Sequence, residues 1–245
     1  MQMIVAPSPT LFDPIDQTAA FAVQFIDPVT FDVVSQEIVV SATGIEGDPV
    51  QGGSGRFVWM GPVPVVPATL TVSATTGSGF SSWTYSAADI AAGISPTPSE
   101  WGLCRLFLRT AASYTFPSGV TVVCGRLRLV PDVVNQPPQV LAGAQVWLQW
   151  QDASKNPATP QLGLRSMGGA NGDFAASLLF PLKSTKSYPQ TAANGDLVLS
   201  LYVARPDPAA GWTQAHTAAG VISGARVGQL VTLAAPIAWS TLTAG

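Results

Sequence analysis

The chain has 245 residues, of which 47% are hydrophobic and only 10% are charged, and its formal net charge is −3. The length suits two small domains or one large one, and the charged fraction lies well below the roughly 25% of a typical soluble domain. Because binding to phosphate backbones needs a basic stripe, these values argue against nucleic acid as the main partner. The low charge predicts a surface shielded in an assembly, a protein that works outside the cytoplasm, or a composition that simply favours small uncharged residues.

Targeting and membrane-spanning patterns are missing from the sequence. Residues 1–7 have neither the cationic start nor the continuous apolar run of a secretory signal, and no stretch reaches the about 18 apolar residues that cross a bilayer. We therefore expect a soluble chain that is synthesised in the cytoplasm and does not enter a membrane. Residues 1–16 contain three prolines and little periodicity, which predicts an extended N-terminal arm that lies along a neighbouring subunit or frays.

Short strands dominate the pattern of the first half. Between residues 18 and 27, small or polar side chains alternate with Phe21, Val23 and Phe25, as in a strand with one strongly apolar face. Residues 45–54 are rich in Gly, Pro and Asp, which predicts turns.

A strand of the form Gly-x-Phe follows those turns. Gly55 can adopt a positive φ at no steric cost and turn the chain into the strand, and Phe57 and Trp59 fall on one face, which predicts an aromatic core face. An apolar strand at 37–42 precedes this strand, and a third strand at 69–74 follows it after a Pro-rich loop.

Beyond the third strand the pattern becomes less regular. Residues 80–85 predict one further strand, and residues 87–92 predict a single helical turn that is stopped by Gly93.

The middle of the chain carries two strand patterns, at 103–109 and 120–129, on either side of a turn around Tyr114. If they pair as a hairpin, Cys104 and Cys124 lie opposite each other, and either a disulfide or two reduced thiols fits. Synthesis in the cytoplasm favours reduced thiols. The same patterns carry a cluster of arginines, which predicts a local interface rather than a nucleic-acid groove: Arg105, Arg109, Arg126 and Arg128.

The second half repeats the order of the first with longer loops. Its upstream strand, its Gly-x-Phe strand and its third strand correspond to 145–150, 171–180 and 197–202. We therefore expect an all-β fold of two tandem β-sandwich modules. The expected boundaries are 1–16 for the arm, 17–115 for the first sandwich and 116–245 for the second.

Tests for catalytic chemistry find no signature. A Ser-His-Asp triad needs a histidine base, and His216, the single histidine, lies in a polar segment without a Gly-x-Ser-x-Gly elbow. The three glutamates lie in unrelated contexts and most aspartates lie beside Pro or Gly, which is typical of turns rather than of a glycosidase pair. Phosphate loops, calcium loops and thiolate zinc spacings are also absent from the sequence. We expect a protein that is not an enzyme and has no catalytic residue, metal site or cofactor.

Tryptophans are the main candidates for binding. The seven are Trp59, Trp83, Trp101, Trp147, Trp150, Trp212 and Trp239. Trp147 and Trp150 differ by an odd number, so in one strand they face opposite sides and at least one of them can leave its own core. Burial in a core or between the modules and exposure to a sugar ring both remain open, and burial is favoured because aromatic side chains dominate buried surfaces.

Gly55-Arg56-Phe57 and Gly172-Asp173-Phe174, each within the order strand, turn, Gly-x-Phe strand, Pro loop, strand, resemble the carboxypeptidase-regulatory-like and transthyretin-like sandwiches, which have an immunoglobulin-like fold. The few charges, the Gly, Pro and Ala content and the all-β pattern resemble structural proteins of tailed bacteriophages. That resemblance implies a virion component of a tail, baseplate or capsid decoration, whose partners are other virion proteins and copies of itself. The alternative is a module that binds host surfaces or glycans weakly.

Overall fold

We describe the protein from a computed structural model, covering residues 18–94, 103–151, 160–162, 165–178, 190–207, 209, 211–217 and 222–244. Strands make up 49% of the structure and helix 5%, which confirms the all-β expectation. The predicted arm at 1–16 lies outside the described residues. No helix in these ranges is long and apolar enough to cross a membrane.

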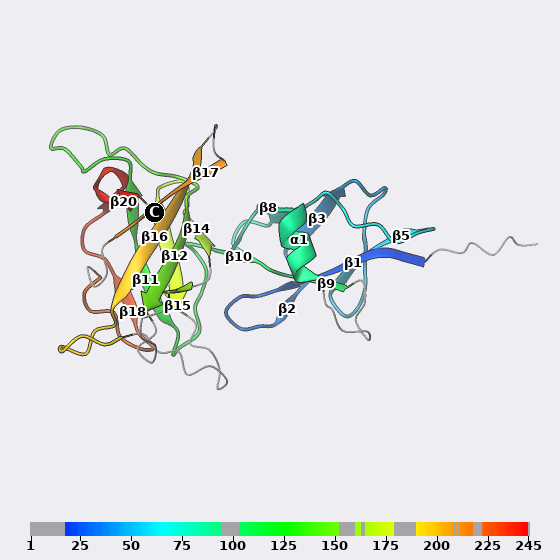
Figure 1. The fold of residues 1–245 in the computed structure, drawn as a ribbon, viewed down its shortest axis with the longest axis horizontal. Helices are drawn as coiled ribbons and strands as arrows, with labels where there is room; N and C mark the ends of the chain where they lie inside the picture. Colours follow the sequence, from blue (N-terminus) through cyan, green and yellow to red (C-terminus); the bar gives the residue numbers. More distant parts are fainter. Residues whose placement is uncertain are drawn as a thin grey trace, which may run out of the picture.

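The first lobe consists of β1–β9 and α1 and has two sheets (Figure 1). In one sheet, β1 (Thr18–Ile26) pairs antiparallel with β5 (Arg56–Gly61) and parallel with β9 (Leu103–Phe107). The short strands β2 (Val33–Val34) and β4 (Val50–Gln51) extend this sheet. The other sheet has the antiparallel order β3 (Ile38–Thr43), β6 (Thr69–Ala74), β8 (Trp83–Ser86).

The second lobe, β11–β20, is built in the same way. β11 (Thr121–Arg128) pairs antiparallel with β15 (Asp173–Leu178) and parallel with β18 (Leu230–Thr232) and β19 (Ile237–Ala238). The other sheet has the antiparallel order β12 (Gln145–Gln151), β16 (Leu199–Asp207), β17 (Gly211–His216), β20 (Thr243–Ala244). β13 (Pro160–Leu162) pairs with β12, and the 3-10 helix η2 spans Trp239–Thr241.

The two lobes therefore share one pairing scheme. In each lobe the Gly-x-Phe strand, β5 or β15, pairs antiparallel with the opening strand, which also pairs parallel with a later strand. The upstream strand and the third strand, β3 with β6 or β12 with β16, pair in the facing sheet. The three strands predicted for each half are present and take matching places in this scheme.

Each lobe has its own hydrophobic core. The first contains Phe21, Val23 and Phe25 of β1 with Phe57 and Trp59 of β5, as their alternation predicts. The second is formed by residues between Val123 and Leu242 and includes Phe174, the aromatic residue of the second Gly-x-Phe strand. Alternation in the strands thus places aromatic residues of both repeats inside.

The lobes meet at a narrow waist. β10 (Arg109–Ala111) pairs parallel with β14 (Ser166–Met167) of the second lobe and antiparallel with β7 (Phe80–Ser81) of the first, so one sheet continues across the waist. Figure 1 shows β10 running between the lobes. After β10, the Tyr114 hydroxyl donates a hydrogen bond of 2.6 Å to Asp27 Oδ2, which ties the connecting segment to the first lobe.

The predicted hairpin of 103–109 with 120–129 is wrong. The first of these segments forms β9, which pairs with β1, and the second forms β11, which pairs with β15 in the other lobe. Cys104 and Cys124 consequently lie in different sheets and both are free thiols. The predicted strand at 80–85 is divided into β7 and β8 at Ser82, since β7 pairs with β10 and β8 with β6.

The predicted helical turn is confirmed as α1 (Ala87–Gly93). Its capping box explains why so short a helix forms. The Ser86 hydroxyl accepts from the Asp89 backbone N–H, and the Asp89 carboxylate accepts from the Ser86 backbone N–H at 2.9 Å and its hydroxyl at 2.8 Å. Ile90 is fully buried and anchors the helix to the first core.

Candidate functional site

The waist contains a cleft of about 360 Å³ with walls from both lobes. We call it the waist cleft. The first lobe contributes residues of β8, α1 and β9, the connecting strand β10 contributes Arg109, and the second lobe contributes β12 and the residue before β14. Its lining includes Tyr85, Asp89, Arg105, Phe107, Arg109, Trp147 and Arg165.

Arg109, from the connecting strand β10, lies against an indole of the first lobe. Its guanidinium carbon is 5.3 Å from the centre of the Trp83 ring. Trp83 also contacts Trp212 of β17 with ring centroids 5.7 Å apart, so the aromatic contact spans both lobes. Stacking on an indole holds a guanidinium in place and leaves its N–H edge available for hydrogen bonds.

The second-lobe wall is a row of side chains on the outer face of its sheet. Arg165 lies 4.8 Å from the centre of the Trp147 ring, Trp147 stacks on Tyr202 at 5.5 Å, and Tyr202 stacks on His216 at 4.7 Å. The register explains the row, because Trp147 pairs with Tyr202 and Tyr202 with His216 on adjacent strands. Arg165 Nη1 also donates to Gln145 Oε1 at 3.0 Å, which fixes its orientation.

Buried N–H groups without an acceptor gather around this cleft. Within the described part of the chain, four buried side-chain nitrogens lack a hydrogen-bond partner. Trp83 Nε1, Arg109 Nε and Trp147 Nε1 belong to the stacked groups just described, and the fourth is Trp150 Nε1 in the second core. Leaving a buried donor unpaired costs about 1–3 kcal/mol, so Arg109 and Trp147, the two of these residues that line the cleft, call for a functional explanation.

The electrostatics of the cleft are cationic. Three arginines and one aspartate line it, and the Asp89 carboxylate already accepts hydrogen bonds from Ser86. Burial lowers the pKa of Arg109, and the nearby charge of Arg165 lowers it further, while Tyr85 and Asp89 act in the opposite direction. Burial raises the pKa of Tyr85, whose neutral hydroxyl donates to the Phe107 carbonyl at 2.8 Å.

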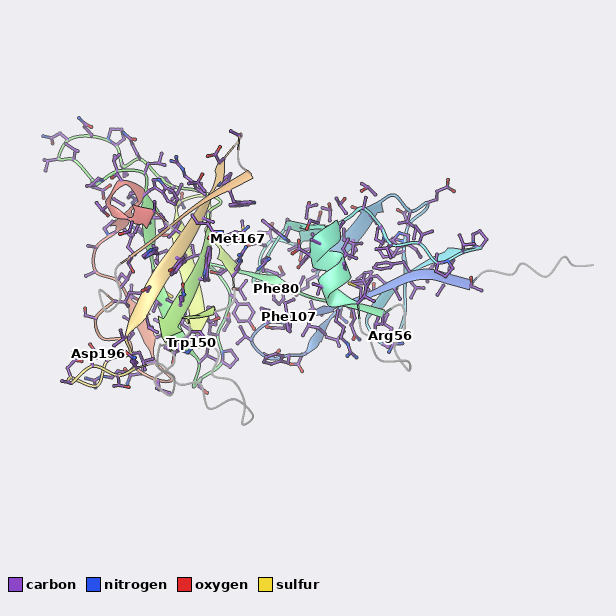
Figure 2. The ribbon with its side chains drawn as sticks, in the orientation of Figure 1. Arg56, Phe80, Phe107, Trp150, Met167 and Asp196 are labelled. Atoms are coloured by element: carbon purple, nitrogen blue, oxygen red, sulfur yellow. The ribbon has the colours of Figure 1, made fainter. Side chains whose placement is uncertain are left out.

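An exposed aromatic pair begins at Phe107, which lines the cleft, and continues to Phe31 outside it. Phe107 is 47% exposed and Phe31, in the turn after β1, is 51% exposed, and their rings meet edge to face at 6.0 Å. Figure 2 shows Phe107 at the end of the first lobe nearest the second, with Met167 across the waist. Val33 of β2 is 42% exposed. We call Phe31, Val33 and Phe107 the apolar rim.

The backbone at Phe31 is strained. Its φ is +64°, a left-handed conformation that costs a non-glycine residue about 1–2 kcal/mol. The turn is held by the Asp27 carboxylate, which accepts from the backbone N–H groups of Val29 at 2.7 Å and Thr30 at 3.3 Å. Strain of this kind tends to persist where surrounding contacts enforce it and where function uses it.

The structure separates the two tryptophans of β12 as predicted. Trp150 belongs to the second core, whereas Trp147 lies outside that core and is only 2% exposed, with Arg165 and Tyr202 against its ring. Among the described tryptophans, Trp59, Trp147 and Trp150 are buried, and Trp83, Trp212 and Trp239 are half-buried. Trp101 lies outside the described residues.

The other residues tested from the sequence take structural positions. The His216 ring stacks on Tyr202, and its Nδ1 lies 2.9 Å from the Thr217 carbonyl oxygen. Burial raises the pKa of the Cys104 thiol to about 12 and also raises that of Cys124, which disfavours the reactive thiolate. No group of three or more His, Cys, Asp or Glu suited to a metal ion occurs among the described residues.

The predicted arginine cluster is divided between different environments. Arg105 and Arg109 line the waist cleft, whereas Arg126 pairs with Asp173 at 3.0 Å and Arg128 with Asp132 at 3.2 Å. The sequence did not point to Arg165, because the strand that places it, β14, has only two residues and no period to recognise.

The chain matches no protein-family model, no curated protein sequence and no solved structure.

Proposed function

We propose that this protein is a non-enzymatic building block that acts through protein–protein interfaces. Its specific form, taken from the resemblance to tailed-bacteriophage structural proteins, is a virion component of a tail, baseplate or capsid decoration. Its partners are neighbouring virion proteins and copies of itself. The low charged fraction and the two-lobed β architecture support this role, because such surfaces suit burial in an assembly.

The observation that carries the proposal is the apolar rim. Phe31, Val33 and Phe107 are each more than two-fifths exposed, although large aromatic side chains are usually buried. Phe31 is held there by a strained turn rather than by a mobile loop end. An ordered, exposed aromatic pair matches the anchor residues around which protein interfaces concentrate their binding energy.

The alternative of a glycan-binding module receives less support. A sugar platform needs an aromatic ring with an open face, and each described tryptophan is buried or half-buried. The exposed aromatic residues of the apolar rim are phenylalanines, one edge-on to the other.

The test is the solution mass of the purified chain, measured by light scattering over a range of concentrations. We expect a discrete oligomer that dissociates in the double variant Phe31→Ser, Phe107→Ser, because two central aromatic contacts are removed. Deletion of residues 1–16, measured in parallel, reports the contribution of the predicted arm.

The matched control is Val133→Ser, Val134→Ser, which also removes two exposed apolar side chains, but from the segment after β11. An unchanged oligomer in the rim variant, or equal dissociation in the control, contradicts the assigned role of the rim. A monomer at all concentrations contradicts self-assembly and leaves other virion proteins as the proposed partners.

A further inference from the structure

We propose that the waist cleft binds a small oxyanion, a carboxylate or phosphate group, between the guanidinium groups of Arg109 and Arg165. This inference does not depend on the proposed assembly role, because it concerns a free anion and a single chain.

The waist cleft has more hydrogen-bond donors than free acceptors among its described residues. Arg109 Nε and Trp147 Nε1 line the cleft or its stacked wall as buried N–H groups that have no acceptor among the described residues. The Asp89 carboxylate, the only one among the described lining residues, already accepts from the backbone and hydroxyl of Ser86. A ligand that supplies acceptor oxygens and negative charge completes this set, whereas a cation or a donor does not.

Arg109 and Arg165 differ in their ion pairing from other arginines of the chain. Arg126, Arg128 and Arg226 each have an aspartate partner within 3.5 Å. In contrast, the ion pairs found among the described residues include neither Arg109 nor Arg165, although both line the waist cleft. Two cations brought to one cleft repel each other, and an anion between them removes that repulsion.

Both guanidinium groups are held in position before a ligand binds. Arg109 lies over Trp83 and Arg165 lies over Trp147, and the Gln145 side chain also holds Arg165. The indoles hold both guanidinium groups in place through cation–π contacts, and guanidinium N–H groups that are not otherwise bonded can make bidentate contact with oxygens. Because Arg109 belongs to the connecting strand β10 and Arg165 to the second lobe, a bound oxyanion also ties the connecting strand to the second lobe.

The experiment is isothermal titration calorimetry of the full-length chain with sodium phosphate and, separately, sodium acetate, in a low-salt buffer free of other oxyanions. We expect saturable binding of one anion per chain. The phosphate and acetate arms show whether the site prefers a tetrahedral or a planar oxyanion, and saturation by either one supports the proposal.

Variants then locate the binding. Arg109→Gln and Arg165→Gln should each weaken it about tenfold or more, since each removes charge-assisted hydrogen bonds. Arg165→Lys should restore part of the loss by keeping the charge without the planar edge. The matched control Arg126→Gln removes a more exposed arginine that is paired with Asp173 and should bind like the wild type.

The absence of saturable binding in the wild type overturns the proposal. So does an equal loss in the control, because that result indicates a general charge effect. Circular dichroism verifies folding of each variant. If Arg109→Gln does not fold, the wild-type titration and the Arg165 pair of variants still decide the matter, because Arg165 lies outside both hydrophobic cores.

Discussion

Gly55 and Gly172 occupy matching places in the two lobes, each at the entry to a Gly-x-Phe strand. Their φ angles are +72° and +76°, as the prediction of a positive φ at Gly55 requires. Each is also crowded. A Cβ on Gly55 would lie 2.5 Å from Val33 Cγ1, and one on Gly172 would lie 2.5 Å from the Leu127 carbonyl oxygen. The repeat therefore keeps glycine for two reasons, conformation and close approach.

We expect Gly172→Ala to destabilise the protein by more than the about 1–2 kcal/mol of a left-handed non-glycine residue, because backbone at Leu127 must also move. The control is Gly195→Ala in the same lobe, where φ is +85° and a Cβ meets nothing within 4 Å. Urea unfolding of the two variants gives the comparison. Equal losses of unfolding free energy show that close approach has no role.

At the scale of elements, the turn around Asn194 and Gly195 is fastened to a distant segment by one carboxylate. Asp196 accepts hydrogen bonds from the Gly224 backbone N–H at 2.7 Å and from Asn194 Nδ2 at 3.0 Å, and it pairs with Arg226. These interactions, the Gly224 hydrogen bond foremost, hold the pKa of Asp196 below its usual value. The Leu197 N–H to Ala225 carbonyl bond of 2.7 Å closes the same contact.

The lowered folded-state pKa of Asp196 fixes the direction in which its contribution to stability changes with pH. The stability that Asp196 contributes is present above the unfolded-state pKa of about 4 and is lost as the pH falls through the lower folded-state value. Asp196→Asn should therefore be less stable than the wild type at pH 7, and the difference should shrink toward acid. Thermal unfolding at several pH values measures this, with Asp48→Asn as an exposed-carboxylate control. A difference that does not change with pH contradicts the assignment.

The sequence predicts the positions of several strands but not all of their partners. The positions of β5, β12 and β15 follow from alternation and from turn-forming glycines, which are local signals. The partners of β9 and β11 do not, because parallel pairing with a strand far away in the chain leaves no local pattern. The sequence could not predict the waist cleft for the same reason. Arg109 and Arg165 are brought together by β10 and β14, strands of three and two residues.

On the scale of the whole molecule, the coupling between the lobes is narrow. β10 and β14 share two residue pairs, Thr110 with Ser166 and Ala111 with Met167, whereas each lobe has a separate core. Two cores joined by so short a ladder need not unfold together.

We therefore expect two transitions in calorimetry, one for each lobe. Leu70→Ala, in the first core, and Leu148→Ala, in the second, should each cost about 2–5 kcal/mol and lower the melting temperature of one transition only. Each variant serves as the control for the other. A single transition that both variants lower equally would show that the waist unites the cores into one cooperative unit.

The parallel pairing of β1 with β9 affects the length of the molecule. A chain whose first and last strands run the same way enters a lobe at one pole and leaves it at the opposite pole. A second lobe must then continue the line instead of folding back beside the first, and Figure 1 shows the lobes following one another along the long axis. The first lobe lengthens the molecule by about the span of its opening strand, roughly 30 Å for the nine residues of β1. The parallel order of β1 and β9 thus adds length to the molecule along its long axis.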